Sequence, residues 1–542
     1  MLPFELRLYH RRRIPWWLPL LMMGLLALGG CRAPQRTSTQ QATVTILADG
    51  QRQEVQVALG STVAEALQAA GLTLGPLDRT EPPDYTLVGG DLEVRVIRVR
   101  EAFHVEQEVI PFERRVLRNE GLPAGETRLL QAGVNGLREV TYRQVFEDGV
   151  EVANQPVKTV VVKKAQPEIV MVGVQAPFLP RKIPGRLAYL AAGNAWVMEE
   201  NTGQRRPVVT TGDLDGRVFA LSPDRRWLLF TRQAEEKDAL NTLWVADLDA
   251  DPPQLISLGV GNIAHFAAFA PYSSLTVYYS TVEPRPGPPG WQANNDLRMV
   301  TFSASGWVSE PRLVVEANAG GVYGWWGTTF AWSPQGGRLA FARADAVGVV
   351  DLDEGTLEPW LNLPPYQTHA DWAWVPGVGW SPDGAVLFAV THGLPGAKDT
   401  PESAPDFHLV ALPTALGWPV VLAHDVGMFA YPRPSPWQKA PKGQSDYWVA
   451  YLQASFPQQS DTSRYRLMVM DRDGSNRREV FPPEGGLGLE PQPVVWSPEP
   501  VPEFESLALA VIYQGNLYLV SAQDGTFQQL TGDGLITAVD WR

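Results

Sequence analysis

The chain has 542 residues, a formal net charge of −14 and a hydrophobic content of 44%. An acidic surface repels phosphate backbones, so the composition argues against a nucleic-acid partner. The length and the apolar fraction predict several folded domains, each with a core of its own.

The first 30 residues have the three-part layout of an export signal. Four arginines precede the uncharged run from Ile14 to Gly30, and two glycines then lead into Cys31, the single cysteine of the chain. The order LGGC resembles the lipobox of bacterial lipoproteins, in which the signal is cut before the cysteine and the sulfur receives a diacylglycerol. The resemblance implies a signal peptide over residues 1–30 and lipidation of Cys31.

A lipidated cysteine predicts an exported protein that is anchored to a membrane on the extracytoplasmic side of a bacterial envelope. The alternative is an uncleaved transmembrane anchor, because the run Ile14 to Gly30 reaches the short limit for crossing a bilayer. Residues 31–42 are polar after the cysteine and lack any periodicity, which predicts a tether.

Residues 43–100 predict a small α+β module. VTILADGQRQEVQV contains two alternating runs around Asp49-Gly50, a strong hairpin signal. Thr62 and Glu65 have capping-box spacing before an apolar helical face, and a later alternating run predicts a further strand. The stretch resembles the ubiquitin-like module of resuscitation-promoting factors and related cell-wall proteins.

Residues 101–175 predict a single-layer β domain with a hairpin turn at Asp148-Gly149. Five glycines resemble the pattern of the G-five domain: Gly125, Gly133, Gly136, Gly149 and Gly173. We expect positive φ at Gly133 and Gly136. The resemblance implies either a stalk or contact with cell-wall glycans, and both interpretations stay open.

A proline-rich linker over residues 176–184 precedes a repeat over residues 185–542. Its units include FALSPDRRWLLFTR, FAWSPQGGRLAFAR and VGWSPDGAVLFAVT, and a degenerate copy is MFAYPRPSP. The prolines that close the opening strands are Pro223, Pro271, Pro334, Pro382, Pro436 and Pro498. The string LMVMDRDGSNRREV resembles the repeat of TolB-type β-propellers.

The two ends of the repeat region complete each other. ITAVDWR at the C-terminus has the shape of an opening strand, whereas the segment from Arg186 has second, third and fourth strands without an opener. Joining them removes an exposed sheet edge and gives seven openers. The predicted fold class is therefore mainly β, with a ubiquitin-like α+β module, a single-layer β domain and a seven-bladed β-propeller; six or eight blades remain open.

Long loops and aromatic links are expected on one face of this propeller, which predicts a ligand-binding face. The candidate residues are Tyr323, Trp325, Trp326, Tyr366, Trp372 and Trp374. For each ring, the alternative is packing between blades.

Enzymatic activity is the less favoured interpretation. His265, His369 and His424 lie in separate links without metal-ligand spacing, and no hydrolase motif is found. We therefore expect no catalytic residues, no metal and no cofactor. The predicted function is a non-catalytic envelope lipoprotein that binds a protein, peptide or glycan; the alternative is a propeller hydrolase or lyase that acts on envelope glycans.

Overall fold

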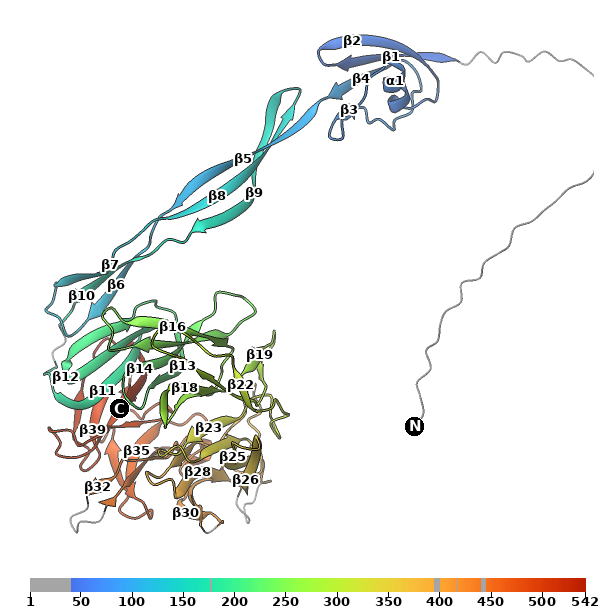
Figure 1. Ribbon diagram of the computed structural model, residues 1–542. Helices are drawn as coiled ribbons and strands as arrows, with labels where there is room; N and C mark the ends of the chain where they lie inside the picture. The colour runs from blue at the N-terminus through green and yellow to red at the C-terminus, as the bar shows by residue number, and fades with distance from the viewer. Residues whose placement is uncertain (1–39, 176–177, 394–399, 416, 440–444) are drawn as a thin grey trace, which may run out of the picture. The chain divides into compact units, whose positions relative to one another are not determined.

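The computed structural model describes residues 40–542 except 176–177, 394–399, 416 and 440–444 (Figure 1). The predicted signal peptide and Cys31 lie outside the described residues. Strands dominate the structure, and the described part of the chain contains one α-helix, α1 (Val63–Ala69). No helix in that part is long and apolar enough to cross a membrane.

Contacts within the chain divide it into two compact units. Of the described residues, one unit holds those up to Pro111 together with Asn135–Ala165, and the other holds Phe112–Val134 together with those of the range Gln166–Arg542. The G-five segment therefore contributes one sheet to each unit.

The first unit begins with a four-stranded sheet in the order β2-β1-β4-β3. Asp49 and Gly50 form the predicted hairpin turn, with φ of 53° and 75°. α1 begins with the predicted capping box: Thr62 Oγ1 accepts the Glu65 N–H, and the Glu65 carboxylate accepts the Thr62 N–H. The strands are β1 (Gln41–Ala48), β2 (Gln51–Ala58), β3 (Arg79–Glu81) and β4 (Leu92–Ile97).

A three-stranded sheet in the order β5-β8-β9 completes the first unit. Its strands are β5 (Val99–Ile110), β8 (Gly136–Glu147) and β9 (Val150–Lys163). Most of its side chains are exposed, as the prediction of a single layer requires, and Val140 is a buried exception at 4% exposure.

The second sheet of the G-five segment, in the order β6-β10-β7, belongs to the second unit. Its strands are β6 (Arg114–Asn119), β7 (Thr127–Gln131) and β10 (Glu168–Gly173). Leu117 and Met171 of this sheet share an apolar cluster with Leu187 and Trp196, so the sheet packs on the structure that follows.

The glycines of the G-five pattern serve two purposes. Gly125 and Gly149 turn the chain at φ of 83° and 85°. The prediction of positive φ at Gly133 and Gly136 is wrong, because neither adopts it. A Cβ at Gly133 would lie 2.4 Å from a phenylalanine ring, and one at Gly136 would lie 2.6 Å from the Lys163 carbonyl oxygen, so close approach requires glycine there.

In the described residues, the rest of the second unit contains seven antiparallel sheets of three or four strands, which we number sheet 1 to sheet 7, and two two-stranded sheets: β19 (Val282–Pro284) with β20 (Trp291–Ala293), and β32 (Gln438–Lys439) with β33 (Ser445–Asp446). Sheet 1 contains β41 (Ile536–Trp541), β11 (Lys182–Ala191) and β12 (Asn194–Val209); sheet 2 contains β13 (Leu214–Leu221), β14 (Trp227–Gln233), β15 (Asn241–Asp247) and β16 (Gln254–Gly261). Sheet 3 contains β17 (Ala267–Ala270), β18 (Ser273–Tyr279), β21 (Leu297–Thr301) and β22 (Arg312–Val315); sheet 4 contains β23 (Thr329–Trp332), β24 (Leu339–Arg343), β25 (Ala346–Asp351) and β26 (Thr356–Asn362). Sheet 5 contains β27 (Val378–Trp380), β28 (Val386–His392), β29 (Phe407–Pro413) and β30 (Val420–Ala423); sheet 6 contains β31 (Arg433–Pro434), β34 (Trp448–Ala454), β35 (Tyr465–Asp471) and β36 (Arg478–Phe481). Sheet 7 contains β37 (Val495–Trp496), β38 (Ala508–Tyr513), β39 (Asn516–Ser521) and β40 (Phe527–Gln529).

Apolar clusters join these sheets in chain order. Leu190 of sheet 1 packs in one cluster with Phe230 of sheet 2, and comparable clusters join sheets 2 and 3, 3 and 4, 4 and 5, 5 and 6, and 6 and 7. The last cluster contains Leu519 of sheet 7 and Leu187 of sheet 1. The order of packing therefore returns to the sheet where it began.

Sheet 1 is built from both ends of the repeat region, as predicted. β41 pairs with β11 from Leu187 opposite Trp541 to Ala191 opposite Ile536. The prediction of a fourth strand is wrong, because β12 continues for 16 residues without a turn. β12 pairs with β11 from Asn194 opposite Ala191 to Asn201 opposite Lys182, and the Thr202 N–H donates to the Arg181 carbonyl just before β11, so the pairing extends to the middle of β12.

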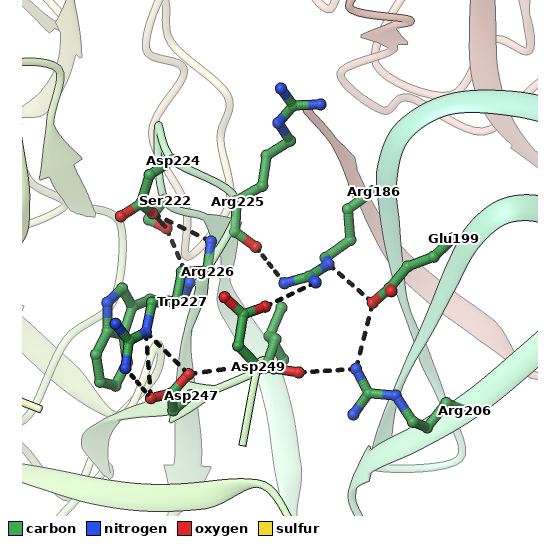
Figure 2. Close-up of polar contacts among 11 residues, drawn as sticks. Arg186, Glu199, Arg206, Ser222, Asp224, Arg225, Arg226, Trp227, Asp247 and Asp249 are labelled. Carbon is green, nitrogen blue, oxygen red and sulfur yellow. Dashed lines mark hydrogen bonds and ion pairs between the residues drawn. The ribbon is translucent and has the colours of Figure 1, made fainter. Parts of the chain in front are cut away.

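The Ser-Pro pairs of the repeat close the turn after the first strand of a sheet. In sheet 2, Ser222 Oγ accepts the Trp227 N–H at 2.9 Å and donates to the Asp224 carboxylate at 2.5 Å (Figure 2). A proline is favoured at the second position of such a turn. The serines of four other sheets accept a backbone N–H from the second strand in the same way: Ser333, Ser381, Ser435 and Ser497.

Polar contacts near this turn tie sheet 1 to sheet 2. The Arg186 guanidinium of β11 donates to the Arg225 carbonyl at 2.6 Å and lies 2.9 Å from carboxylate oxygens of Asp249 and Glu199 (Figure 2). Each of these contacts is to a different chain segment, so one side chain orients two neighbouring sheets.

The tryptophans of the repeat connect first strands of neighbouring sheets. Trp380 Nε1 of sheet 5 donates to the Ala331 carbonyl of sheet 4 at 3.0 Å. Trp496 Nε1 of sheet 7 donates to the Arg433 carbonyl of sheet 6 at 2.7 Å. These hydrogen bonds hold the first strands side by side, where the links between sheets also meet.

Candidate functional site

A cavity of about 380 Å³ lies where the links into sheets 3 to 7 reach the first strands of those sheets. Each of the five links contributes to the lining, through His265, Trp326, Val375, Tyr431 and Pro493. A cavity of this size falls within the range of small-molecule sites, which is about 300–1,000 Å³. We therefore treat it as the candidate ligand site.

Trp326 forms an aromatic wall of this cavity. Its ring centroid lies 5.2 Å from that of His265 and 5.2 Å from that of Trp291. Trp291 belongs to the hairpin of β19 (Val282–Pro284) and β20 (Trp291–Ala293), which is inserted between β18 and β21. The structure thus brings a long loop of sheet 3 and the link into sheet 4 together at the site.

His265 contributes a neutral imidazole. Burial lowers its pKa to about 4, the positive charge of Arg217 acts in the same direction, and a hydrogen bond with the Trp326 carbonyl opposes both. His265 Nε2 lies 2.7 Å from that carbonyl oxygen, so Nε2 carries the proton and donates it. Nδ1 is therefore the acceptor nitrogen of the ring.

Tyr431 and Arg433 supply the polar groups from sheet 6. Burial raises the pKa of Tyr431 to about 12, so its hydroxyl is neutral. Arg433 is the first residue of β31, and its side chain is exposed within the cavity. The surrounding protein lowers the pKa of Arg433 by desolvation, and the charge of Asp540 acts in the opposite direction.

Five of the six predicted ligand-binding aromatic residues are half-buried: Tyr323, Trp325, Trp326, Tyr366 and Trp372. Of these, Trp326 lines the cavity, and Trp325 packs edge-on against it with ring centroids 5.9 Å apart. Tyr366 packs on Phe407, and Trp372 packs on Phe429.

The expectation that the Trp374 ring is exposed on the predicted ligand-binding face is wrong. Its side chain is 1% exposed and belongs to the apolar cluster between sheets 5 and 6. Its indole Nε1–H donates to the Met428 carbonyl at 2.9 Å, so the one polar atom of the ring is satisfied inside the core.

The three link histidines lie apart. His265 lines the cavity, whereas His369 and His424 are exposed in other links and do not line it. Over the described residues, no group of three or more His, Cys, Asp or Glu side chains could hold a metal ion.

The sequence prediction did not include Arg433, although the repeat contains a signal for it. Arg433 stands two residues before the serine of its Ser-Pro pair. The same position in four other copies holds a small or apolar residue: Ala220, Ala331, Gly379 and Val495. A charge at a position that is otherwise apolar in a repeat marks a candidate site.

Two family models match the first part of the chain. The model of the G5 domain matches residues 102–175, and the model of the G5-linked ubiquitin-like domain matches residues 44–83. Both resemblances predicted from the sequence are confirmed. G5 domains are typical of extracellular bacterial proteins and are associated with cell-wall and glycan binding.

The search of curated proteins gives no match. Among solved structures, the G5 domain of HP0197 is 25% identical, with 14% of this chain and 99% of that chain covered and a TM-score of 0.14. The G5 domain of an IgA1 protease is 22% identical, with 15% and 94% covered and a TM-score of 0.12. The periplasmic gluconolactonase of Pseudomonas aeruginosa is 14% identical, with 66% and 98% covered and a TM-score of 0.41.

Proposed function

We propose that this chain is a non-catalytic lipoprotein of a bacterial cell envelope, which presents a β-propeller face to a protein, peptide or glycan ligand. The cavity at the meeting point of five links is the observation that carries this proposal. Aromatic and proline side chains with a few polar groups are the usual lining of a ligand site.

The seven sheets are the blades of this propeller, which we assign to the TolB type on the string quoted above. Two observations support the arrangement: the apolar clusters join successive sheets, and sheet 7 packs on sheet 1. Because β41 pairs with β11, the first and the last strand of the repeat region lie in one sheet, and the edge of β11 is covered.

The anchor and the G5 domain define where this face is presented. A lipid on Cys31 would hold the protein on the extracytoplasmic side of a membrane. The G5 domain supports a location near the cell wall, where its exposed single-layer sheet serves as a stalk or contacts glycans.

The proposal is tested with the full chain in detergent, incubated separately with purified cell-wall glycan and with an envelope extract. We expect the chain to bind and retain either the cell-wall glycan or a component of the envelope extract. We expect the double variant Trp325→Ala, Trp326→Ala to lose it, because these rings form and support the cavity wall.

The matched control removes two tryptophans outside the cavity, Trp307→Ala and Trp418→Ala, whose side chains are 60% and 63% exposed. Equal retention by both double variants would contradict the ligand face. Release of soluble fragments from the glycan would instead support a hydrolase or lyase, so the supernatant is analysed by chromatography.

A further inference from the structure

We propose that the cavity binds a sugar acid about one ring in size and that Arg433 holds the carboxylate of this ligand. The inference deepens the proposed function, because it assigns a ligand class to the same site. It rests on the charge of the cavity, on the free donors of Arg433 and on the remaining lining.

The cavity is lined by a cationic side chain in a protein that is strongly negative overall. Among the described lining residues, Arg433 is the one side chain that carries a charge at neutral pH. A pKa of about 4 leaves His265 neutral, and a pKa of about 12 leaves Tyr431 neutral. A local cation in a chain of net charge −14 attracts anions to this point of the surface.

The guanidinium of Arg433 has donors available for a ligand. Within the described part of the chain, it makes no hydrogen bond or ion pair. Asp540, whose charge acts on it, already accepts the Leu221 N–H at 2.7 Å and the Trp541 N–H at 2.9 Å, and it lies 3.7 Å from Arg542 Nε. Asp540 is thus already engaged by other groups, and no pairing of the Arg433 guanidinium uses up any of its five N–H donors in the described residues.

One guanidinium matches one negative charge. Its planar fork binds a carboxylate through two parallel hydrogen bonds, which is the geometry that arginine provides and lysine does not. A phosphate dianion would leave a second charge without a partner in a site where desolvation is already marked. The single cation therefore favours a carboxylate over a phosphate.

The rest of the lining suits a hydroxylated ring. Trp326 contributes an aromatic ring to the lining, His265 Nδ1 can accept a hydroxyl proton, and the Tyr431 hydroxyl can donate or accept. A volume of about 380 Å³ lies near the small end for ligand sites, which fits a single ring better than a long chain.

The test measures binding of D-glucuronate, D-glucose and inorganic phosphate to the full chain in detergent, by calorimetry and by ligand-observed NMR. We expect glucuronate to bind and both other probes to bind at least about tenfold more weakly. Arg433→Gln should weaken glucuronate binding by at least about tenfold, and Arg433→Lys should bind with intermediate strength because it keeps the charge without the fork.

The matched control is Arg472→Gln, which removes the same charge from the turn after β35 of sheet 6, outside the cavity. It should bind glucuronate as the parent chain does, and all variants should melt within a few degrees of it. Failure of the parent chain to bind glucuronate, binding that Arg433→Gln leaves unchanged, or tighter binding of phosphate would each overturn the inference. Retention of wall glycan or an envelope partner alongside any of these results would leave the proposed function standing, so the two failures are distinguishable.

Discussion

Glu120, which follows β6, and Arg205 of β12 form a buried ion pair, with 2.6 Å between Oε2 and Nη1. Glu120 Oε1 also accepts the Gly532 N–H at 2.9 Å, and Arg205 Nη2 donates to the Leu530 carbonyl at 2.5 Å. The pair therefore joins three segments: the second G5 sheet, sheet 1 and the link between sheets 7 and 1. Together with the apolar cluster described above, it joins the second half of the G5 domain to the seven sheets, which form one compact unit with it.

Breaking this pair should loosen the attachment of the second G5 sheet. Glu120→Ala leaves the Arg205 guanidinium buried without its carboxylate, which costs about 3–5 kcal/mol for such pairs. Denaturant unfolding should show the loss, and hydrogen exchange at the Gly532 amide should accelerate. The control Glu126→Ala removes an exposed pair with Arg128 in the same segment and should cost less than about 1 kcal/mol. Equal effects of the two variants would contradict the role of the buried pair.

Removal of Leu535–Arg542 should disrupt the unit of seven sheets. The deletion exposes the edge of β11 and removes Ile536 and Trp541 from the core, each 3% exposed. We expect either aggregation, which light scattering measures, or loss of cooperative melting, which calorimetry measures. Thr537→Ser on the same strand should melt like the parent chain. A truncated chain that melts as sharply and at the same temperature would show that β41 is dispensable.

Trp374→Ala should act on stability. The ring is 1% exposed and its indole hydrogen bond is buried, so truncation leaves a cavity and an unpaired carbonyl at a cost of about 3–5 kcal/mol. Trp307→Ala is the control, because its ring is 60% exposed and truncation there should cost within about 0.5 kcal/mol. Near-native melting of Trp374→Ala would contradict its placement in the core.

Stability should fall as the pH is lowered from about 6.5 to about 4. In that window His265 takes up a proton in the unfolded chain, whereas burial holds its pKa at about 4 in the folded chain. Because the unfolded state binds more protons, the free energy of unfolding decreases as the pH is lowered. The full loss from this group is about 3 kcal/mol. Burial also lowers the pKa of His392 and of His408, which adds in the same direction.

Urea unfolding at pH 7 and pH 4.5 measures this dependence. His265→Gln should lose less stability between the two pH values than the parent chain, because it has no proton to take up on unfolding. His369→Gln, at an exposed histidine, should keep the parent's pH dependence. An unchanged slope in His265→Gln would show that His265 is not the group responsible.

Cys31→Ser tests the predicted anchor. Without the thiol, no diacylglycerol can be attached, so the protein should leave the membrane fraction or keep its uncut signal. Fractionation, mass spectrometry and incorporation of labelled lipid provide the readouts. A variant that stays membrane-bound at unchanged mass, from a parent that incorporates no lipid, would indicate a plain apolar anchor.

Turns, the helix cap and the order of the strands follow from residues that are close together in the chain. The Asp49-Gly50 turn, the capping box of α1 and the Ser-Pro turns form from residues close in the chain, and each appears where its pattern predicts. The pairing of the two ends of the repeat region in sheet 1 could also be predicted, because the segment from Arg186 lacks an opening strand and the C-terminal segment supplies one.

The position of the cavity and the exposure of its residues depend on long-range packing. Trp374 and Trp326 stand in similar aromatic links, yet one ring fills a gap between sheets and the other lines the cavity. Alternation along a strand tells which residues share a face, but burial of a ring in a link depends on neighbours that are distant in sequence. The cavity forms from five links that are far apart in the sequence, and Arg433 reaches it from β31, a relationship that no local pattern contains.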